Sequence, residues 1–199
     1  QDGLPALPSL PAKTMALSAA GLRRYEFEHR ALEASEVITS HDPFTFQVNP
    51  AFAQKFQPRM RDRAAAELQV MRIAAQLSPD ALLTDFHTLD RGAPIVGPDL
   101  LVESGNGRVM GLVRAIQDFP ENYAAYKVEL VKRAESLGLK ASAILRLKAP
   151  VLVRVRLTKL EDKDRTAFVQ EANVPSGISR SAIEQARTDS EKITLARLE

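Results

Sequence analysis

The chain has 199 residues, of which 45% are hydrophobic and 26% are charged, and its formal net charge is +2 at pH 7. These values are ordinary for a globular protein, and the length suits one large domain, with or without an appended arm. No apolar run approaches the roughly 18 residues that predict a transmembrane helix, so we expect no membrane partner. The absence of cysteine excludes disulfides, thiol nucleophiles and cysteine-ligated metals, and it agrees with a reducing compartment.

The basic residues are clustered, although the net charge is small. Residues 140–159 carry six basic side chains and no acid, and residues 55–63 carry four basic side chains against one acid. Clusters of this size favour contact with phosphate groups, but solvated faces of a helix and a strand explain them equally well. The candidate contacts to nucleic acid are Arg59, Arg61, Lys148, Arg154 and Arg156; for the last two, the domain's own acids are the alternative partners.

The first part of the chain predicts an arm and then a strand. Residues 1–21 are rich in Pro and Ala, which favours an extended, linker-like segment. The chain begins without an initiator methionine or a signal-peptide pattern, so we expect a fragment of a larger parent polypeptide. Imperfect alternation over residues 25–33 predicts the first strand, and the turn formers of residues 40–50 predict a loop.

Two helices and two short strands are predicted next. A helix from Asp62 to Leu77 is indicated by a core-facing stripe at helical spacing, formed by Ala65, Leu68, Met71, Ile73 and Leu77. A short helix over residues 78–83 has Ser78 as its N-cap and Pro79 at its first position. The apolar bursts 94–97 and 100–103, separated by Pro98-Asp99, predict two strands joined by a turn.

The remaining elements complete an α+β domain with a small mixed sheet and flanking helices. Residues 119–139 predict a long helix closed by Gly138, and a short helix follows over residues 142–148. Alternation over residues 151–157 predicts the clearest strand in the chain. Helices are expected near 161–173 and 180–194. This pattern predicts a core over residues 22–160 with a helical insert at 119–148, followed by C-terminal helices over 161–199.

The stretch 103-ESGNGRVMGLVRA-115 predicts a strand, a glycine turn and a helix start. It matches neither G-x-G-x-x-G, because residue 110 is Met, nor the P-loop, because the Walker lysine is missing. The amides of a helix start favour an anion, and Arg108 adds a cation in the first turn. We expect Arg114, about a turn and a half later, to reach the same side. The alternative is a tight turn whose arginine caps a neighbouring carbonyl.

Two carboxylates and one loop are the other candidate site residues. Glu103 and Glu171 could hold a metal ion or position a water, or they could be surface carboxylates. If both lie beside Arg108, a hydrolase that uses Mg²⁺ or Mn²⁺ is indicated; if only Arg108 and the amides converge, binding without hydrolysis is the better account. His41 and Asp42 are candidates for the pocket, with ordering of the turn before Pro43 as the alternative role of Asp42. Adjacent residues cannot form a catalytic triad, so Ser40-His41-Asp42 is not read as one.

The order of these features resembles the ParB/sulfiredoxin superfamily. A strand leads into a Gly-x-x-Arg helix start, then come a helical insert, a strand of the form PVLVRV and a helix near Glu-x-Asn. Within the superfamily the chain is most similar to the DdrB-like ParB domains of phage and conjugative-element polyvalent proteins. The resembling stretches are 33–52, 57–83, 92–115 and 150–173.

The resemblance implies that the glycine turn binds phosphate groups of a nucleotide or of nucleic acid. It assigns this role to Gly105, Asn106, Gly107, Arg108 and Asn173, with CTP or ATP as the implied nucleotide and DNA as the implied macromolecular partner. The Gly-Glu-Arg-Arg and Glu-Asn boxes of partitioning ParB proteins become 105-GNGR-108 and 171-EAN-173 here. Asn106 stands where sulfiredoxin has its cysteine, which excludes that reductase chemistry.

The leading expectation is a ParB-like domain from a mobile-element protein that binds phosphate groups in a bacterial cytoplasm. The sequence leaves open whether the domain hydrolyses nucleotides or nucleic acid with a metal ion and whether it forms a homodimer. The alternatives are a non-catalytic DNA-binding or interaction module and a nuclease effector that acts as a toxin.

Overall fold

The structure is a computed structural model that describes residues 12–57 and 62–175. Within these residues a five-stranded mixed sheet has the order β1-β2-β5-β3-β4. Its strands are β1 Lys13–Leu17, β2 Arg24–Glu33, β3 Ile95–Val96, β4 Val102–Ser104 and β5 Pro150–Arg156. All neighbouring strands pair antiparallel except β3 and β5, which run parallel. The predicted α+β class is therefore confirmed.

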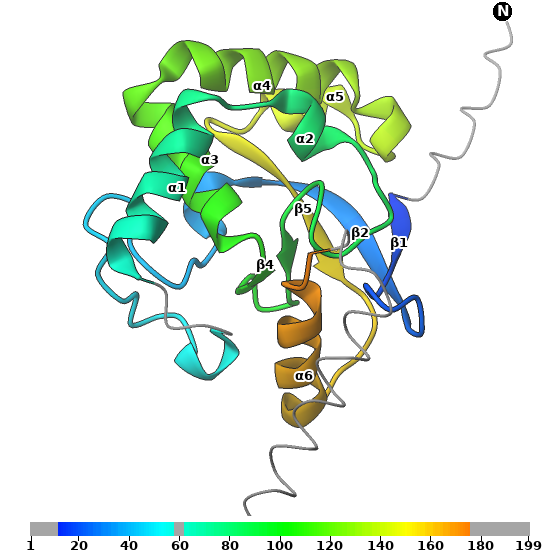
Figure 1. Cartoon of the computed structure of the whole chain (residues 1–199). Helices are drawn as coiled ribbons and strands as arrows, with labels where there is room; N and C mark the ends of the chain where they lie inside the picture. The colour runs from blue at the N-terminus through cyan, green and yellow to red at the C-terminus, as the bar shows by residue number, and fades with distance from the viewer. Residues whose placement is uncertain (1–11, 58–61, 176–199) are drawn as a thin grey trace, which may run out of the picture.

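The helices form two layers on opposite sides of this sheet (Figure 1). Five of them gather on one side: α1 Arg63–Ala75, α2 Pro79–Leu83, α3 Asn106–Asp118, α4 Pro120–Lys132 and α5 Ala141–Leu145. The sixth, α6 Asp162–Ala172, lies on the other side, and short 3₁₀ turns cover Ala34–Glu36, Gln54–Phe56 and Glu135–Leu137. Each layer buries its own core. Tyr126, Leu112 and Val153 belong to the larger core, and Phe27 and Phe168 belong to the smaller one beneath α6.

Local chemistry explains most of these elements. Ser78 Oγ accepts from the N–H of Ala81 with Pro79 at the first helical position, as predicted for α2. The predicted strands over 94–97 and 100–103 are β3 and β4, which pair antiparallel. The helix predicted near 161–173 is α6. The helix predicted over 180–194 lies outside the described residues.

Three predictions differ from the structure. Residues 13–17 of the expected arm form β1, which pairs with β2 through five residues. The long helix expected over 119–139 ends at Lys132, and Gly138, with φ +73°, closes a separate 3₁₀ turn. On α1 the buried residues are Val70 and Ala74, whereas Leu68 of the expected core stripe is 61% exposed. That helix carries apolar residues all round, so spacing alone does not identify its buried face.

Across the described ranges, the structure contains no helix that combines the length and apolar character required to cross a bilayer.

Candidate phosphate-binding site

The glycine turn sets the start of α3. Gly105 is the N-cap of this helix and has φ +93°, a left-handed conformation that favours glycine. A Cβ atom there would lie 2.8 Å from Nε and Nη2 of Arg108, so the turn also needs glycine to let that guanidinium fold over it. This helix start has a glycine at its N-cap position and therefore lacks an N-cap side chain. Its first N–H groups therefore have no partner within the helix and favour an anion.

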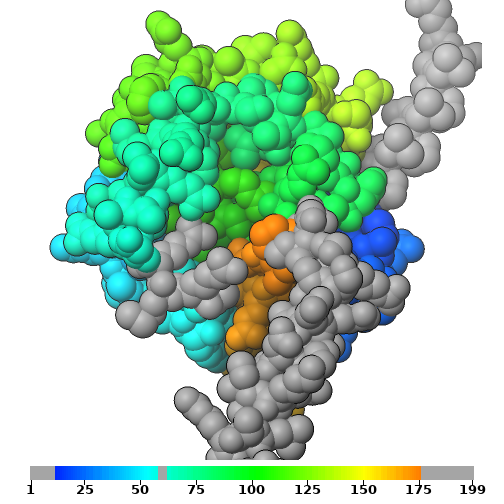
Figure 2. Space-filling model, in the orientation of Figure 1, coloured from blue at the N-terminus to red at the C-terminus, as the bar shows by residue number. Residues whose placement is uncertain are grey.

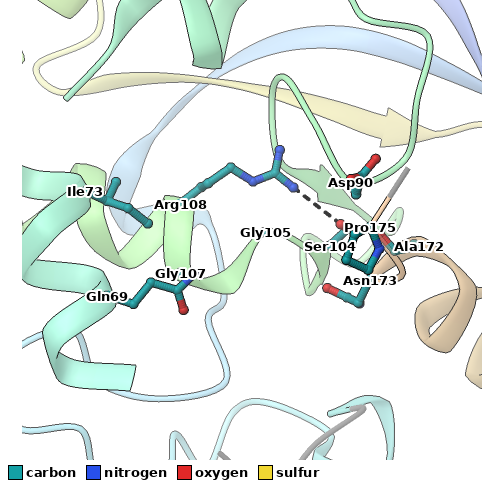
Figure 3. Close-up of a pocket in the computed structure, with 10 residues that line it drawn as sticks. All are labelled: Gln69, Ile73, Asp90, Ser104, Gly105, Gly107, Arg108, Ala172, Asn173 and Pro175. Atoms are coloured by element: carbon teal, nitrogen blue, oxygen red, sulfur yellow. Dashed lines mark hydrogen bonds between the residues drawn. The ribbon is translucent and has the colours of Figure 1, made fainter. Parts of the chain in front are cut away.

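A cavity of about 220 Å³ opens at this helix start. Three helices, the end of β4 and two loops contribute to it, and the close-up in Figure 3 shows the labelled side chains around a common space. In the space-filling view the green surface of α3 lies between the teal of α1 and the orange of α6 (Figure 2). The lining residues are Gln69, Ile73, Asp90, Ser104, Gly105, Gly107, Arg108, Ala172, Asn173 and Pro175.

Arg108 is the cation of this cavity. It donates from Nη1 to the carbonyl of Gly92 at 2.5 Å and from Nη2 to Ser104 Oγ at 3.4 Å (Figure 3). Two of its five N–H donors are used in this way within the described residues. Burial lowers the pKa of Arg108 to about 10, against the opposing effect of the Asp90 charge, so the group remains a cation at neutral pH.

Arg154, expected to meet nucleic acid or an acid of the domain, lies in the interior instead. It is 2% exposed, and its guanidinium donates to the carbonyls of Thr88, Leu89, Arg91 and Ala93 at 2.6–3.3 Å. Burial, followed by the nearby charge of Arg108, lowers the pKa of Arg154 to about 9. The residue therefore holds the loop over residues 88–93 and does not present a surface to a partner.

Glu103 and Arg156 form part of a buried ion cluster. Arg156 donates to both Glu103 oxygens at 2.8 and 3.2 Å, and Arg165 Nε donates to Glu103 Oε2 at 2.7 Å. Arg165 also binds both oxygens of Asp99 at 2.7 and 2.8 Å. Glu103 is 1% exposed and Arg156 is 4% exposed. The alternative that Arg156 meets the domain's own acids is thus the one found, and Glu103 is a buried ion-pair partner and not a surface carboxylate.

The two candidates at the end of α6, Glu171 within the helix and Asn173 just after it, point to different places. Glu171 accepts a hydrogen bond from the hydroxyl of Tyr25 at 2.8 Å and does not line the cavity. Asn173 does line it, and its Nδ2 donates to the carbonyls of Glu103 at 3.0 Å and Val169 at 2.6 Å. Because both partners are carbonyls, the amide nitrogen must face them, which leaves the amide oxygen for the cavity.

Asn106 and Arg114, the other predicted site residues on α3, contact the loop over residues 40–46. Asn106 Oδ1 accepts from the N–H of Ser40 at 2.9 Å, so its side chain holds this loop. Arg114 was expected beside Arg108, but it pairs with Asp118 at 2.8 Å and stacks over Phe44 at 5.0 Å from the ring centroid. The helix turns this side chain away from the glycine turn. Of the predicted phosphate-binding set, the structure brings together Gly105, Gly107, Arg108 and Asn173.

A second cavity, of about 210 Å³, lies between that loop and α1. His41 lines it, and its Nδ1 lies 2.9 Å from Ser40 Oγ. The carboxylate of Asp42 accepts instead from the N–H groups of Phe44 and Thr45, both at 2.8 Å. The backbone N–H groups of Thr45 and Phe44 lower the pKa of Asp42 below its usual value. Asp42 therefore orders the turn, and the three adjacent residues form no triad.

Of the remaining basic candidates, Lys148 does not line the cavity at the start of α3. Lys148 is exposed near β5, where its backbone N–H donates to Glu33. Arg59 and Arg61 lie outside the described residues. Asp90, Ser104 and Gln69 line the cavity but were not predicted, because tertiary contacts bring them there and no local pattern marks them.

Metal ligands are not grouped in the described part of the chain. Among residues 12–57 and 62–175, no three His, Asp or Glu side chains are arranged to hold a metal ion. Neither Glu103 nor Glu171 lines the cavity beside Arg108. The donors that converge there suit an anion and not a metal coordinated by protein groups alone.

The comparisons with known proteins agree with this architecture. Neither the curated proteins nor the solved structures gave a match. The model of the ddrB-like ParB superfamily domain matches residues 21–157, which include β2 to β5 and the glycine turn. Because the match covers well over half of the chain, the protein belongs to the ddrB-like ParB superfamily domain family.

Proposed function

We propose that this domain binds a phosphate group of a nucleotide or nucleic acid in the cavity at the start of α3. Family membership suggests a function related to DNA or nucleotides. The observation that carries the proposal is the convergence of the Gly105 turn, the first amides of α3 and the Arg108 guanidinium on one cavity. A guanidinium and helix amides are complementary to phosphate oxygens.

We propose that the domain binds the phosphate group and that Glu103 and Glu171 do not hydrolyse the ligand. Glu103 already neutralises two arginines, and Glu171 accepts from Tyr25 outside the cavity. A cavity of about 220 Å³ is smaller than the roughly 300–1,000 Å³ of sites that enclose whole small ligands. It therefore suits a phosphate and the groups next to it, with the rest of the nucleotide outside. The proposed setting is a bacterial cytoplasm, within a larger mobile-element protein.

Equilibrium binding to CTP, ATP and GTP, with and without Mg²⁺ or Mn²⁺, tests the proposal. We expect Arg108→Ala to weaken binding by tenfold or more, because charge-assisted hydrogen bonds are lost, and Arg108→Lys to restore part of the affinity. Arg72→Ala is the matched control, since Arg72 is an exposed arginine on α1 that does not line the cavity. Unchanged binding by Arg108→Ala, with its fold verified by circular dichroism, would show that the site is wrong.

Turnover is measured on the same proteins with nucleotide and DNA substrates. We expect that Glu171→Gln does not abolish any metal-dependent cleavage, because the Glu171 carboxylate lies outside the cavity. Loss of a robust cleavage activity in Glu171→Gln would replace the binding proposal with a hydrolase.

A further inference from the structure

Two cavities border the first turn of α3. Asn106 lines the cavity between α1 and the loop over residues 40–46, and Gly107, the next residue, lines the phosphate cavity. The helix α1 contributes to both, with Ala66 at the first cavity and Gln69, three residues later, at the second. Because consecutive Cα atoms are only about 3.8 Å apart, both cavities meet the same short stretch of backbone. A ligand whose phosphate lies at the helix start therefore has the cavity beside Asn106 as its neighbour.

The two cavities differ in chemical character. Charged and amide side chains line much of the phosphate cavity, whereas Phe46, Ala66 and Met110 give the cavity beside Asn106 an apolar wall. An aromatic ring and a thioether pack well against a planar ring, but they do not replace the hydration of a phosphate. The cavity beside Asn106, of about 210 Å³, therefore suits an uncharged planar group.

Asn106 supplies this cavity with a hydrogen-bond donor. The residue is 8% exposed, and its Oδ1 accepts from the N–H of Ser40 at 2.9 Å. Because the Ser40 partner is a donor, it fixes which end of the amide is the oxygen, and the nitrogen takes the other end. Within the described residues, the Asn106 Nδ2 donates no hydrogen bond. A buried amide donor beside apolar walls favours a ligand atom that accepts, such as a carbonyl oxygen or a ring nitrogen.

The loop over residues 40–46 holds Phe46 at the cavity wall. Phe46 has φ +57°, a left-handed conformation that is rare for an aromatic residue. Its N–H donates to the carbonyl of Asp42 at 2.9 Å, and Arg63 Nη2 donates to the carbonyl of Thr45 at 3.0 Å. Such a conformation persists only where the surrounding contacts fix it, so the ring is in place before a ligand binds.

We propose that the cavity beside Asn106 binds the nucleobase of the ligand whose phosphate lies at the start of α3. Phe46 and Met110 pack against the base, and Asn106 Nδ2 donates to an acceptor on its edge. The inference rests on the proposed phosphate-binding function and adds the part of the ligand that this second cavity recognises. Packing against an aromatic ring and a hydrogen bond to the base edge favour a nucleotide over a sugar phosphate without a base.

Calorimetric titration of the full chain compares CMP, UMP, AMP and GMP with ribose 5-phosphate, which has the same sugar and phosphate but no base. We expect at least one nucleotide to bind tenfold or more tightly than ribose 5-phosphate, as packing of one base on an aromatic side chain predicts. Ala66→Phe places a ring in the cavity and should abolish this advantage without changing the affinity for ribose 5-phosphate. Ala65→Phe is the matched control, because Ala65 is exposed on α1 and lines neither cavity.

Asn106→Asp is a second variant, and it decides the question if Ala66→Phe does not fold. The substitution keeps an oxygen for the N–H of Ser40 and removes the amide donor. We expect the ratio of nucleotide affinity to ribose 5-phosphate affinity to fall about fivefold, as loss of one hydrogen bond predicts. The added charge acts on the phosphate of both probes, so it does not change this ratio. Circular dichroism verifies the fold of each variant.

The outcomes separate this inference from the proposed function. If no probe binds, or if Arg108→Ala binds every probe as the wild type does, the phosphate site itself is wrong. If binding depends on Arg108 but no nucleotide binds more tightly than ribose 5-phosphate, only the nucleobase inference is overturned. The same holds if the advantage of the nucleotide survives in folded Ala66→Phe, because the base then lies elsewhere. Equal weakening of both probes in that variant also overturns the inference, since the cavity would not distinguish the base.

Discussion

Arg156 and Arg165 donate to the carboxylates of Glu103 and Asp99, whereas Arg108 and Arg154 donate to backbone carbonyls and a serine hydroxyl. We call Arg156, Arg165, Glu103 and Asp99 the acid-balanced cluster. Arg108 and Arg154 are the carbonyl-bound pair. Carboxylates contact the guanidinium groups of the first set directly, whereas carbonyl dipoles solvate those of the second set, on which the charge of Asp90 also acts. The cavity opens at Arg108 of this pair. The number of arginines therefore says less about where an anion is expected than the hydrogen-bond partners of each arginine do.

The largest loss of stability is expected when the acid-balanced cluster is altered. Glu103→Gln leaves Arg156 and Arg165 buried without their shared carboxylate, and we expect a loss of about 3–5 kcal/mol in the free energy of unfolding. Urea denaturation measures it. Asp118→Asn is the control, because its partly exposed pair with Arg114 along α3 should contribute only about 0.3–0.5 kcal/mol. A similar small loss in both variants would refute the distinction between the two sets of arginines.

An intermediate effect is expected where the carbonyl-bound pair meets the glycine turn. Gly105→Ala adds a Cβ against the Arg108 guanidinium at a left-handed φ, and we expect a loss of about 1–3 kcal/mol together with weaker phosphate binding. Gly21→Ala is a close control, since Gly21 also has a positive φ, +67°, but its added Cβ would meet nothing within 4 Å. A larger loss of stability in Gly105→Ala than in Gly21→Ala, with weaker phosphate binding in Gly105→Ala alone, would indicate the contact with Arg108. Equal losses and unchanged binding would argue against it.

The smallest effect concerns the exposed edge of the acid-balanced cluster. Burial alone would raise the pKa of Asp99, but the hydrogen bonds and charge of Arg165 outweigh it and hold the pKa below its usual value of 3.8. The stability from this carboxylate is therefore full above pH 4 and is lost as the pH falls through the lowered pKa. Because Asp99 is 42% exposed, we expect Asp99→Asn to cost only about 0.5–1 kcal/mol at pH 7. The difference from wild type should shrink at pH 3; a constant difference would mean that charge is not its cause.

Local signals in the sequence predicted much of the fold. Ser78 and Pro79 mark the start of α2, and the alternation after Pro150 marks β5, because caps and strand periods act within a few residues. The glycine turn and Arg108 were predicted for the same reason. β1 was missed, because its five residues follow a proline-rich stretch and are too few to show a clear period. Their strand conformation depends on pairing with β2.

The partners of the charged residues could not be predicted in this way. Glu103 and Arg156 are separated by 53 positions, and Asp90 reaches the cavity only because Arg154 and Arg108 hold its loop. An alternating strand predicts that Arg154 and Arg156 share a face, but it does not show that this face is covered by α6 and the loop over residues 88–93. Burial and counter-charge are set by tertiary packing, which one sequence does not display.

The helix α6 has a consequence for where the domain ends. The family match stops at residue 157, before this helix, yet α6 supplies Arg165 to the acid-balanced cluster, Phe168 to the smaller core and Asn173 to the cavity. A chain cut at residue 157 would keep every residue of the family match, but it would expose that core, leave Glu103 with one arginine and open one wall of the cavity. The folded unit is thus longer than the unit that sequence similarity recognises, and protease-resistant fragments of the protein should extend through Asn173.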